Sequence, residues 1–110
     1  MKSAMSKIVL ASLLCLSPLS SHAIETFTIN IKDHKFDPAE LTIPADTKVK
    51  LLVMNLDSTP EEFESYELHR EKIIRGNSKA IIFVGPLKAG SYPFFGEFNP
   101  KTAQGRIIVK

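Results

Sequence analysis

The sequence predicts an all-β protein built as a small sandwich of two sheets. Two observations indicate this fold class. Short stretches rich in β-branched and apolar residues alternate with polar positions, and turns containing Gly, Pro or Asp separate these stretches at short intervals. Strands spaced in this way usually form a sandwich or a barrel. Residues 24–110, which carry the pattern, are enough for one domain with a single modest core.

The first 23 residues are typical of a secretory signal peptide. Met1–Lys7 contains two lysines and no acid, Ile8–Leu16 is a mostly apolar run, and Ser21-His22-Ala23 fits a cleavage site. We therefore predict a signal peptide at residues 1–23 and one secreted domain at residues 24–110. The apolar run is shorter than a membrane-spanning helix, so no membrane span is expected in the mature chain. A retained membrane anchor is the alternative.

Removal of the signal peptide changes both the charge and the cysteine count. The full chain has 14 Lys and Arg against 12 Asp and Glu, and two of the lysines lie in the predicted signal. The mature domain is therefore close to neutral, and nothing in it indicates nucleic-acid binding. Cys15 is the only cysteine and also lies in the signal, so the mature domain has no disulfide and no thiolate ligand.

The expected strands follow the turns along the chain. Alternation and β-branched residues predict strands, each bounded by turn residues, in Thr26–Ile31, part of Phe36–Pro44, Lys48–Asn55, Lys79–Val84, Ser91–Phe95 and Arg106–Val109.

The segment from Thr59 to Arg75 departs from this pattern, because five acids lie between Glu61 and Glu71. Thr59 fits the N-cap of a helix, Pro60 its first position and Glu62 the end of a capping box. An irregular strand and loop is the alternative. We expect a short helical or looped excursion around residues 60–75.

Two parts of the chain resemble a known family. The segment Lys88–Asn99, followed by Gly105 and the strand Arg106–Lys110, is similar to the closing turn of cupredoxins, the fold of the blue-copper proteins. Lys35-Phe36-x-Pro38 and Pro44–Val49 are similar to the beginning of the same fold. The resemblance covers almost the whole mature chain and implies a cupredoxin-like Greek-key β-sandwich in the periplasm.

The resemblance also implies that the type 1 copper ligands are replaced. Blue-copper proteins have a Cys and a His at the positions of Gly96 and Asn99, and their first His at the position of Glu61. No type 1 copper centre is therefore expected.

Other segments resemble the cupredoxin partners of Ftr- and Efe-type bacterial iron-uptake systems. This likeness implies a periplasmic iron-binding protein and an inner-membrane iron permease as partners. The segments that carry it are Pro60–Ser65, Arg70–Lys72 and Phe95–Phe98.

The candidate metal ligands are Glu61, Glu97, His69, Glu62 and Glu64. Carboxylates suit iron and manganese, whereas imidazole is a common ligand of iron, copper and zinc. The alternative is structural: Glu61 could cap a helix, and the other side chains could be solvated surface residues. The remaining histidine, His34, is expected in an early turn away from the ligand end.

The leading hypothesis is a periplasmic protein that binds iron or copper and takes part in ferrous iron uptake. It would hold Fe(II), or assist its oxidation and transfer to a partner. No catalytic triad or phosphate-binding loop is present, and ferroxidase activity would need a partner's copper, a bound copper or oxygen. The alternatives are a metal-free interaction module and a copper-binding chaperone that uses His69 and His34.

Overall fold

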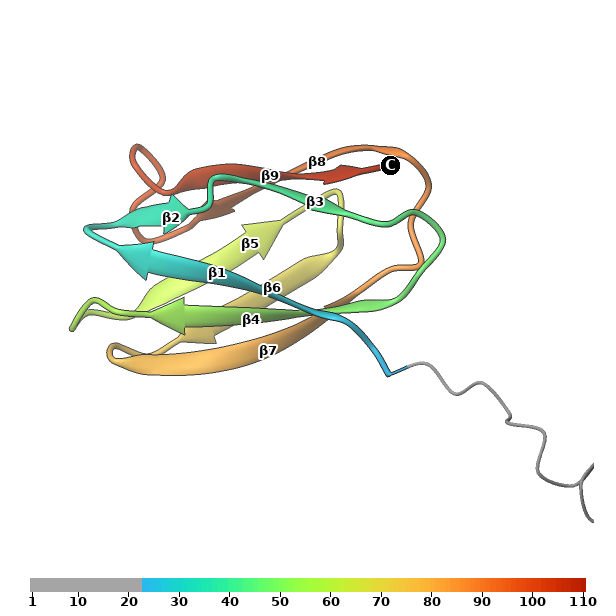
Figure 1. Ribbon diagram of the computed structural model, residues 1–110. Coiled ribbons are helices and arrows are strands. Elements are labelled where there is room, and N and C mark those ends of the chain that lie inside the picture. Colours follow the sequence, from blue (N-terminus) through green and yellow to red (C-terminus); the bar gives the residue numbers. More distant parts are fainter. Residues whose placement is uncertain (1–22) are drawn as a thin grey trace, which may run out of the picture.

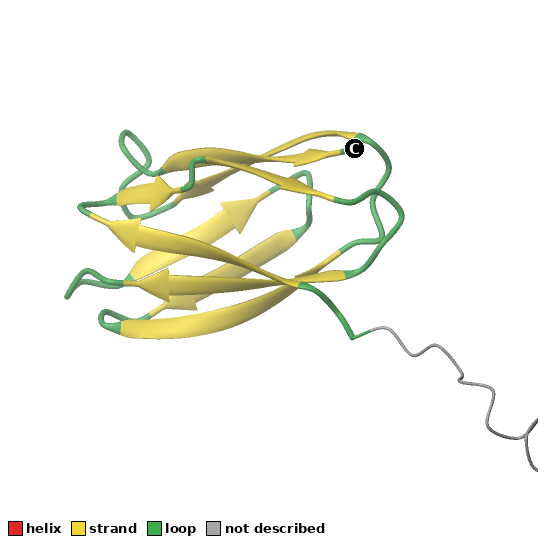
Figure 2. Cartoon of the chain, viewed as in Figure 1, coloured by secondary structure: helices red, strands yellow, loops and turns green. Residues whose placement is uncertain are grey.

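The computed structural model describes residues 23–110, which form two β-sheets packed face to face (Figure 1). The predicted signal peptide lies, except for Ala23, outside the described residues. The described part of the chain contains strands and turns only, and Figure 2 shows no helix in it. It follows that residues 23–110 contain no helix that could cross a membrane.

Nine strands make up the described part of the chain. They are β1 (Thr26–Lys32), β2 (Lys35–Asp37), β3 (Glu40–Ile43), β4 (Val49–Asn55), β5 (Glu61–Ser65), β6 (Arg70–Ile74), β7 (Ser78–Val84), β8 (Gly90–Gly96) and β9 (Gln104–Val109).

The strands divide into a four-stranded sheet, ordered β2-β1-β4-β7, and a five-stranded sheet, ordered β3-β9-β8-β5-β6. β1 pairs with β4 and β3 with β9 in parallel, and the other neighbours are antiparallel. The chain changes sheet five times, between β2 and β3, β3 and β4, β4 and β5, β6 and β7, and β7 and β8. The predicted all-β sandwich is confirmed.

The hydrophobic core lies between the sheets and is built by alternation along the strands. In β4 the side chains of Val49, Leu51 and Val53 are fully buried, while the residues between them face outward. Three aromatic rings fill the centre of the core. Phe94 stacks on Phe63 and meets Phe36 edge-on, with ring centroids 4.9 Å apart in both pairs.

The acidic segment around residues 60–75 is a β-hairpin and not the helical or looped excursion that its sequence suggested. β5 and β6 pair in register, with Glu61 opposite Ile74 and Ser65 opposite Arg70. Burial along β5 alternates at every second residue, which is the period of a strand. Tertiary packing of Phe63 in the core therefore overrides the helix-start signal.

Candidate functional site

Three segments meet at one end of the sandwich, on the left in Figure 1: the start of β5, the end of β8 and the loop of residues 97–103. Backbone hydrogen bonds close the loop. The N–H of Gly96 donates to the carbonyl of Ala103 over 2.8 Å, and the N–H of Ala103 donates to the carbonyl of Asn99 over 2.9 Å. The loop therefore holds its side chains in fixed positions over Glu61.

Asn55 fixes the chain that leads into this site. Its side-chain amide donates to the carbonyls of Thr59 and Ile74 over 2.8 and 3.1 Å. Its side-chain oxygen accepts the N–H of Asp57 over 3.0 Å. These bonds hold the loop between β4 and β5 against the end of β4 and the end of β6. They therefore fix the position of Glu61, the first residue of β5.

The carboxylate of Glu61 is enclosed by this loop, and only 1% of the residue is exposed. Oε1 accepts the backbone N–H groups of Phe98 and Glu62 over 2.8 and 2.9 Å. Oε2 accepts the side-chain amide of Asn99 over 2.8 Å. Hydrogen bonds to a carboxylate are about twice as strong as those between neutral groups. The network therefore stabilises a buried acid that would otherwise be costly.

Gly96 lies directly beside this carboxylate. A Cβ atom at position 96 would stand 2.6 Å from Cδ of Glu61, 2.7 Å from its Oε2 and 2.6 Å from Cβ of Ala103. Such distances are far shorter than van der Waals contact, so the space next to Gly96 is already filled. The Glu61 carboxylate can occupy this space only because residue 96 has no side chain.

The described residues do not fit a type 1 copper ion. Such an ion takes one Cys and two His in a trigonal arrangement, and this chain has no cysteine beyond Cys15. At this end of the sandwich the space beside Gly96 holds the Glu61 carboxylate, whose two oxygens are occupied by hydrogen-bond donors.

His34 lies at this same end, although its sequence context placed it elsewhere. Its carbonyl accepts the hydroxyl of Thr102 over 2.6 Å, and its Nδ1 lies 3.7 Å from the carboxylate of Asp57. Asp57 also accepts the backbone N–H groups of Asp33 and His34, at 2.8 and 3.0 Å. The bond from the His34 backbone, with that from Asp33 and nearby positive charge, lowers the pKa of Asp57 below its usual 3.8.

Glu62 and Glu64 lie on the opposite face of the same strand, the outer face of the five-stranded sheet. Glu71 of β6 stands opposite Glu64, and the three carboxylates offer oxygens that all lie within 4.8 Å of one another. We call Glu62, Glu64 and Glu71 the carboxylate cluster. Sequence reasoning missed Glu71, because only the pairing of β5 with β6 brings it to Glu64.

The carboxylate cluster is electrostatically strained. Partial burial raises the pKa of Glu62 and of Glu64, and the negative charge of Glu71 raises both further. Within residues 23–110, no lysine or arginine forms an ion pair with the cluster. The neighbouring Arg70 instead donates to the backbone carbonyls of Phe83 and His69, both over 2.9 Å. No basic side chain of the described residues therefore pairs directly with the cluster.

The remaining two candidates lie at the margins of the cluster. Glu97 is exposed at the start of the β8–β9 loop, and its N–H donates to the carbonyl of Glu62 over 2.9 Å. His69 ends the turn between β5 and β6 and lines a shallow hollow with Glu64 and Glu71. The structure thus groups Glu62 with Glu64, places Glu97 and His69 nearby, and separates all of them from the inward-facing Glu61.

Comparison with known proteins agrees with this architecture. The cupredoxin-like domain family matches residues 6–109. The chain belongs to this family. An uncharacterized protein of Rickettsia prowazekii (strain Madrid E), RP394, is 52% identical over 81 residues, which are 74% of this chain and 65% of the relative. The chain thus spans less than two thirds of that relative's length.

Solved cupredoxin structures share the fold at low sequence identity. Auracyanin A, a blue copper protein of Chloroflexus aurantiacus, matches 80% of this chain and 100% of its own, with a TM-score of 0.69 and 15% identity. The metal-binding domain of the Streptococcus pneumoniae D39 Cu(I)-exporting ATPase CopA, solved with Cu(I), covers 84% and 91%, with a TM-score of 0.69 and 15% identity. Amicyanin of Paracoccus versutus covers 84% and 85%, with a TM-score of 0.61 and 19% identity. This cupredoxin is therefore related in fold to copper-binding proteins.

Proposed function

We propose that this cupredoxin is an exported periplasmic protein that binds iron at the carboxylate cluster and takes part in ferrous iron uptake. The observation that carries the proposal is the convergence of Glu62, Glu64 and Glu71, whose oxygens lie within 4.8 Å of one another. Carboxylate oxygens suit hard ions such as iron and manganese better than soft Cu(I). His69, beside Glu64 and Glu71, is the nearest imidazole on this face.

The electrostatics of the cluster support a cation. The mutual repulsion that raises the pKa of Glu62 and Glu64 would be relieved by a bound divalent or trivalent ion. The protein supplies no lysine or arginine to do the same within the described residues. Binding is therefore expected to release protons and to weaken as the pH falls.

The same proposal assigns a structural role to Glu61. In this interpretation Glu61, Gly96 and Asn99 have replaced the ligands of an ancestral copper site, and their hydrogen bonds keep the loop folded without metal. The protein then does not transfer electrons through a type 1 centre. An iron-binding protein and an iron permease remain the proposed partners.

A role in iron oxidation would be indirect. Carboxylate ligands stabilise Fe(III) more than Fe(II), so a carboxylate site lowers the reduction potential of the bound iron. Each Fe(II) oxidised gives up one electron, which dioxygen or a partner's copper would have to accept. The chain's own residues would bind and position the iron.

A metal-free interaction module is the second candidate, and the closed network around Glu61 favours it. A site that satisfies itself with protein donors needs no ion to fold. The two candidates differ in one respect: stability and partner affinity of a metal-free module would respond to salt and not to metal.

Anaerobic calorimetric titration of Fe(II) into residues 24–110 tests the proposal. We expect one site per chain, with affinity reduced about tenfold or more in Glu64→Gln and Glu71→Gln, since tenfold corresponds to about 1.4 kcal/mol. Glu67→Gln, an exposed acid in the adjacent turn, is the matched control and should bind like the wild type. Absence of binding in all four proteins would favour the metal-free module.

A further inference from the structure

The outer face of the four-stranded sheet combines exposed apolar side chains with lysines. The register of β4 and β7 places Leu52 beside Ile81, Lys50 beside Phe83 and Met54 beside Lys79. The residues between them in β4 point into the core. We call this set of six residues the lysine-framed face.

Several apolar side chains on this face are exposed to solvent. Ile81 is 49% exposed and Phe83 41%, and Leu56 just beyond β4 is 47% exposed. Two lysines already cover the ring of Phe83, with the Nζ atoms of Lys48 and Lys50 at 4.9 and 5.8 Å from its centroid. Large side chains left open in this way on one sheet face are typical of an interaction surface.

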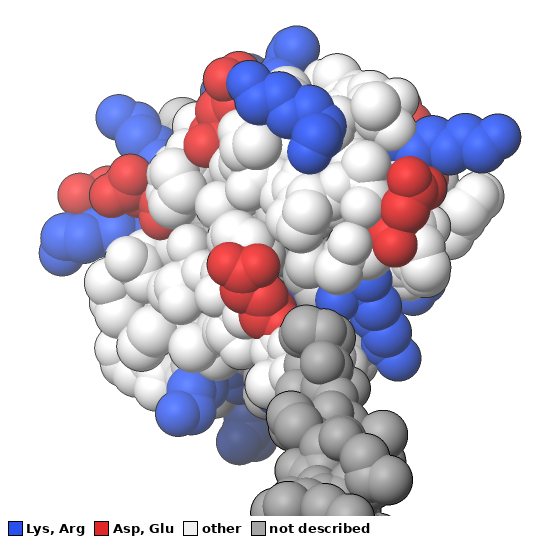
Figure 3. All heavy atoms as spheres, turned by 45° about the vertical axis from the view of Figure 1, so that its right-hand side comes forward, with Lys and Arg blue, Asp and Glu red and all other residues white. Residues whose placement is uncertain are grey.

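Positive charge prevails on the three strands β1, β4 and β7 of this face, and the acid Asp37 lies on the edge strand β2 beside Asn30. The outward positions of β1, β4 and β7 hold Lys32, Lys50 and Lys79 and no acid. At the end of the sandwich brought forward in Figure 3, by contrast, basic and acidic side chains are interspersed. A local excess of lysines around apolar residues selects an acidic partner.

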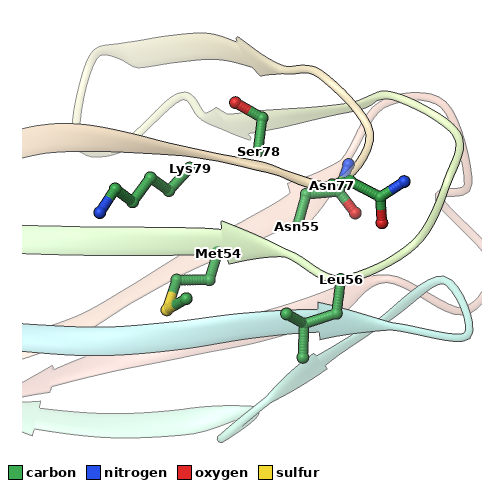
Figure 4. Close-up of a pocket in the computed structure, with 6 residues that line it drawn as sticks. All are labelled: Met54, Asn55, Leu56, Asn77, Ser78 and Lys79. Carbon is green, nitrogen blue, oxygen red and sulfur yellow. The ribbon is translucent and has the colours of Figure 1, made fainter.

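Two hollows lie next to each other on the face. One is lined by Lys50, Leu52, Lys79 and Ile81 with Thr26 and Ala80. The other lies at the end of β4 and is lined by Met54, Asn55 and Leu56 together with Asn77, Ser78 and Lys79 (Figure 4). Lys79 borders both hollows. Apolar side chains of a bound protein would find anchoring positions here, as at the centre of most protein interfaces.

A second copy of this chain is a poor partner for the lysine-framed face. Two copies related by a two-fold axis would bring lysines against lysines, and like charges across an interface are costly. Docking of the carboxylate cluster of a second copy would be a head-to-tail contact, which gives a ring or an open filament and would make the protein associate at high concentration.

We propose that the lysine-framed face binds a partner protein through a segment that carries acidic residues around apolar side chains. The lysines would pair with the acids, and the two hollows would receive the apolar side chains. This surface lies on the other sheet from the carboxylate cluster, so the proposal is independent of metal binding.

Selection from a random peptide library displayed on phage tests this proposal with residues 24–110 as bait. We expect enriched peptides that combine Asp or Glu with aromatic or aliphatic residues, and amide chemical shifts that change at Leu52, Ile81 and their neighbours when these peptides bind. The double variant Lys50→Glu, Lys79→Glu should lose at least about tenfold in affinity for them. Ile81→Ser, which removes apolar contact and no charge, should also weaken binding.

The matched control is the double variant Lys101→Glu, Lys110→Glu, which makes the same charge change at exposed positions outside the face. An equal loss of peptide affinity in both double variants would mean that only the net charge of the protein matters, and this would overturn the proposal. Failure to enrich any acidic peptide would also overturn it. Lysine-dependent binding to phosphatidylglycerol vesicles, without peptide binding, would assign the face to a membrane surface instead.

Discussion

Glu61 and Glu62 are neighbours in β5, yet their carboxylates occupy opposite environments. The carboxylate of Glu61 points into the end of the sandwich and accepts three hydrogen bonds. The carboxylate of Glu62 points out of the same sheet, where partial burial raises its pKa and the charges of Glu71 and Glu97 raise it further. The protein's own donors satisfy Glu61, and Glu62 belongs to the cluster that we propose as the metal site.

The difference arises from the two-residue period of a strand. Side chains next to each other in β5 face opposite sides of the sheet, so one acidic run supplies both a buried carboxylate and the surface carboxylates proposed as ligands. Acidic composition alone does not define a metal site. The number of donors already bound to each carboxylate decides whether it is free to coordinate an ion.

The largest expected effect comes from removing the buried acid. Glu61→Leu replaces the carboxylate by an apolar side chain of similar size and leaves the N–H of Phe98 and the amide of Asn99 without their acceptor. We expect a loss of about 3 kcal/mol in the free energy of unfolding, measured with urea. Glu61→Gln should cost less, because the Asn99 amide can turn to accept from the new NH₂ group. Stability of Glu61→Leu at or above the wild-type value would contradict the structural role.

Gly96→Ala tests the same network from the other side. The added methyl would lie 2.6 Å from Cδ of Glu61, and such overpacking costs about 1–3 kcal/mol. A double-mutant cycle with Glu61→Ala should show that the Gly96→Ala penalty shrinks when the carboxylate is absent. Strict additivity of the two changes would mean that the two positions do not share this space.

Asp57→Ala should lower the free energy of unfolding by about 1 kcal/mol, because it removes the acceptor for two N–H groups in the β1–β2 turn. Asp33 and His34 hold φ angles of 53° and 58°, so the turn depends on this support. The lowered pKa of Asp57 means that its contribution is present above its usual pKa of 3.8 and is lost as the pH falls. Thermal unfolding of the wild type and of Asp57→Ala, at pH values above and below 3.8, measures this contribution. A difference in Tm between the two proteins that persists in acid would contradict it.

The smallest expected effect concerns the carboxylate cluster without metal. The raised pKa values of Glu62 and Glu64 mean that the folded state holds protons more tightly than the unfolded state. Their contribution to stability therefore falls as the pH rises from about 4.5 through the raised values. Glu64→Gln should remove part of this dependence and slightly raise Tm at neutral pH. A lower Tm for this variant at neutral pH would show that Glu64 is already paired.

The sequence was sufficient for the sandwich and its principal strands, because alternation in segments such as Val49–Asn55 reports burial directly. It was misleading for β5, where an acid occupies an inward position and the capping pattern at Thr59 suggested a helix. Glu61 meets Asn99 38 residues away in the chain, and no local pattern reveals such a contact. For the same reason Glu71 and the true position of His34 became visible only after the strands were paired.

Anomalous diffraction from crystals of residues 24–110 soaked in Fe(II) or Mn(II) would locate the metal directly. Our account predicts a single peak bordered by the carboxylates of Glu62, Glu64 and Glu71, with the hydrogen bonds of Glu61 unchanged. A peak between Glu61 and Asn99, with the β8–β9 loop displaced, would contradict the assignment of Glu61 as structural and of the outer cluster as the metal site.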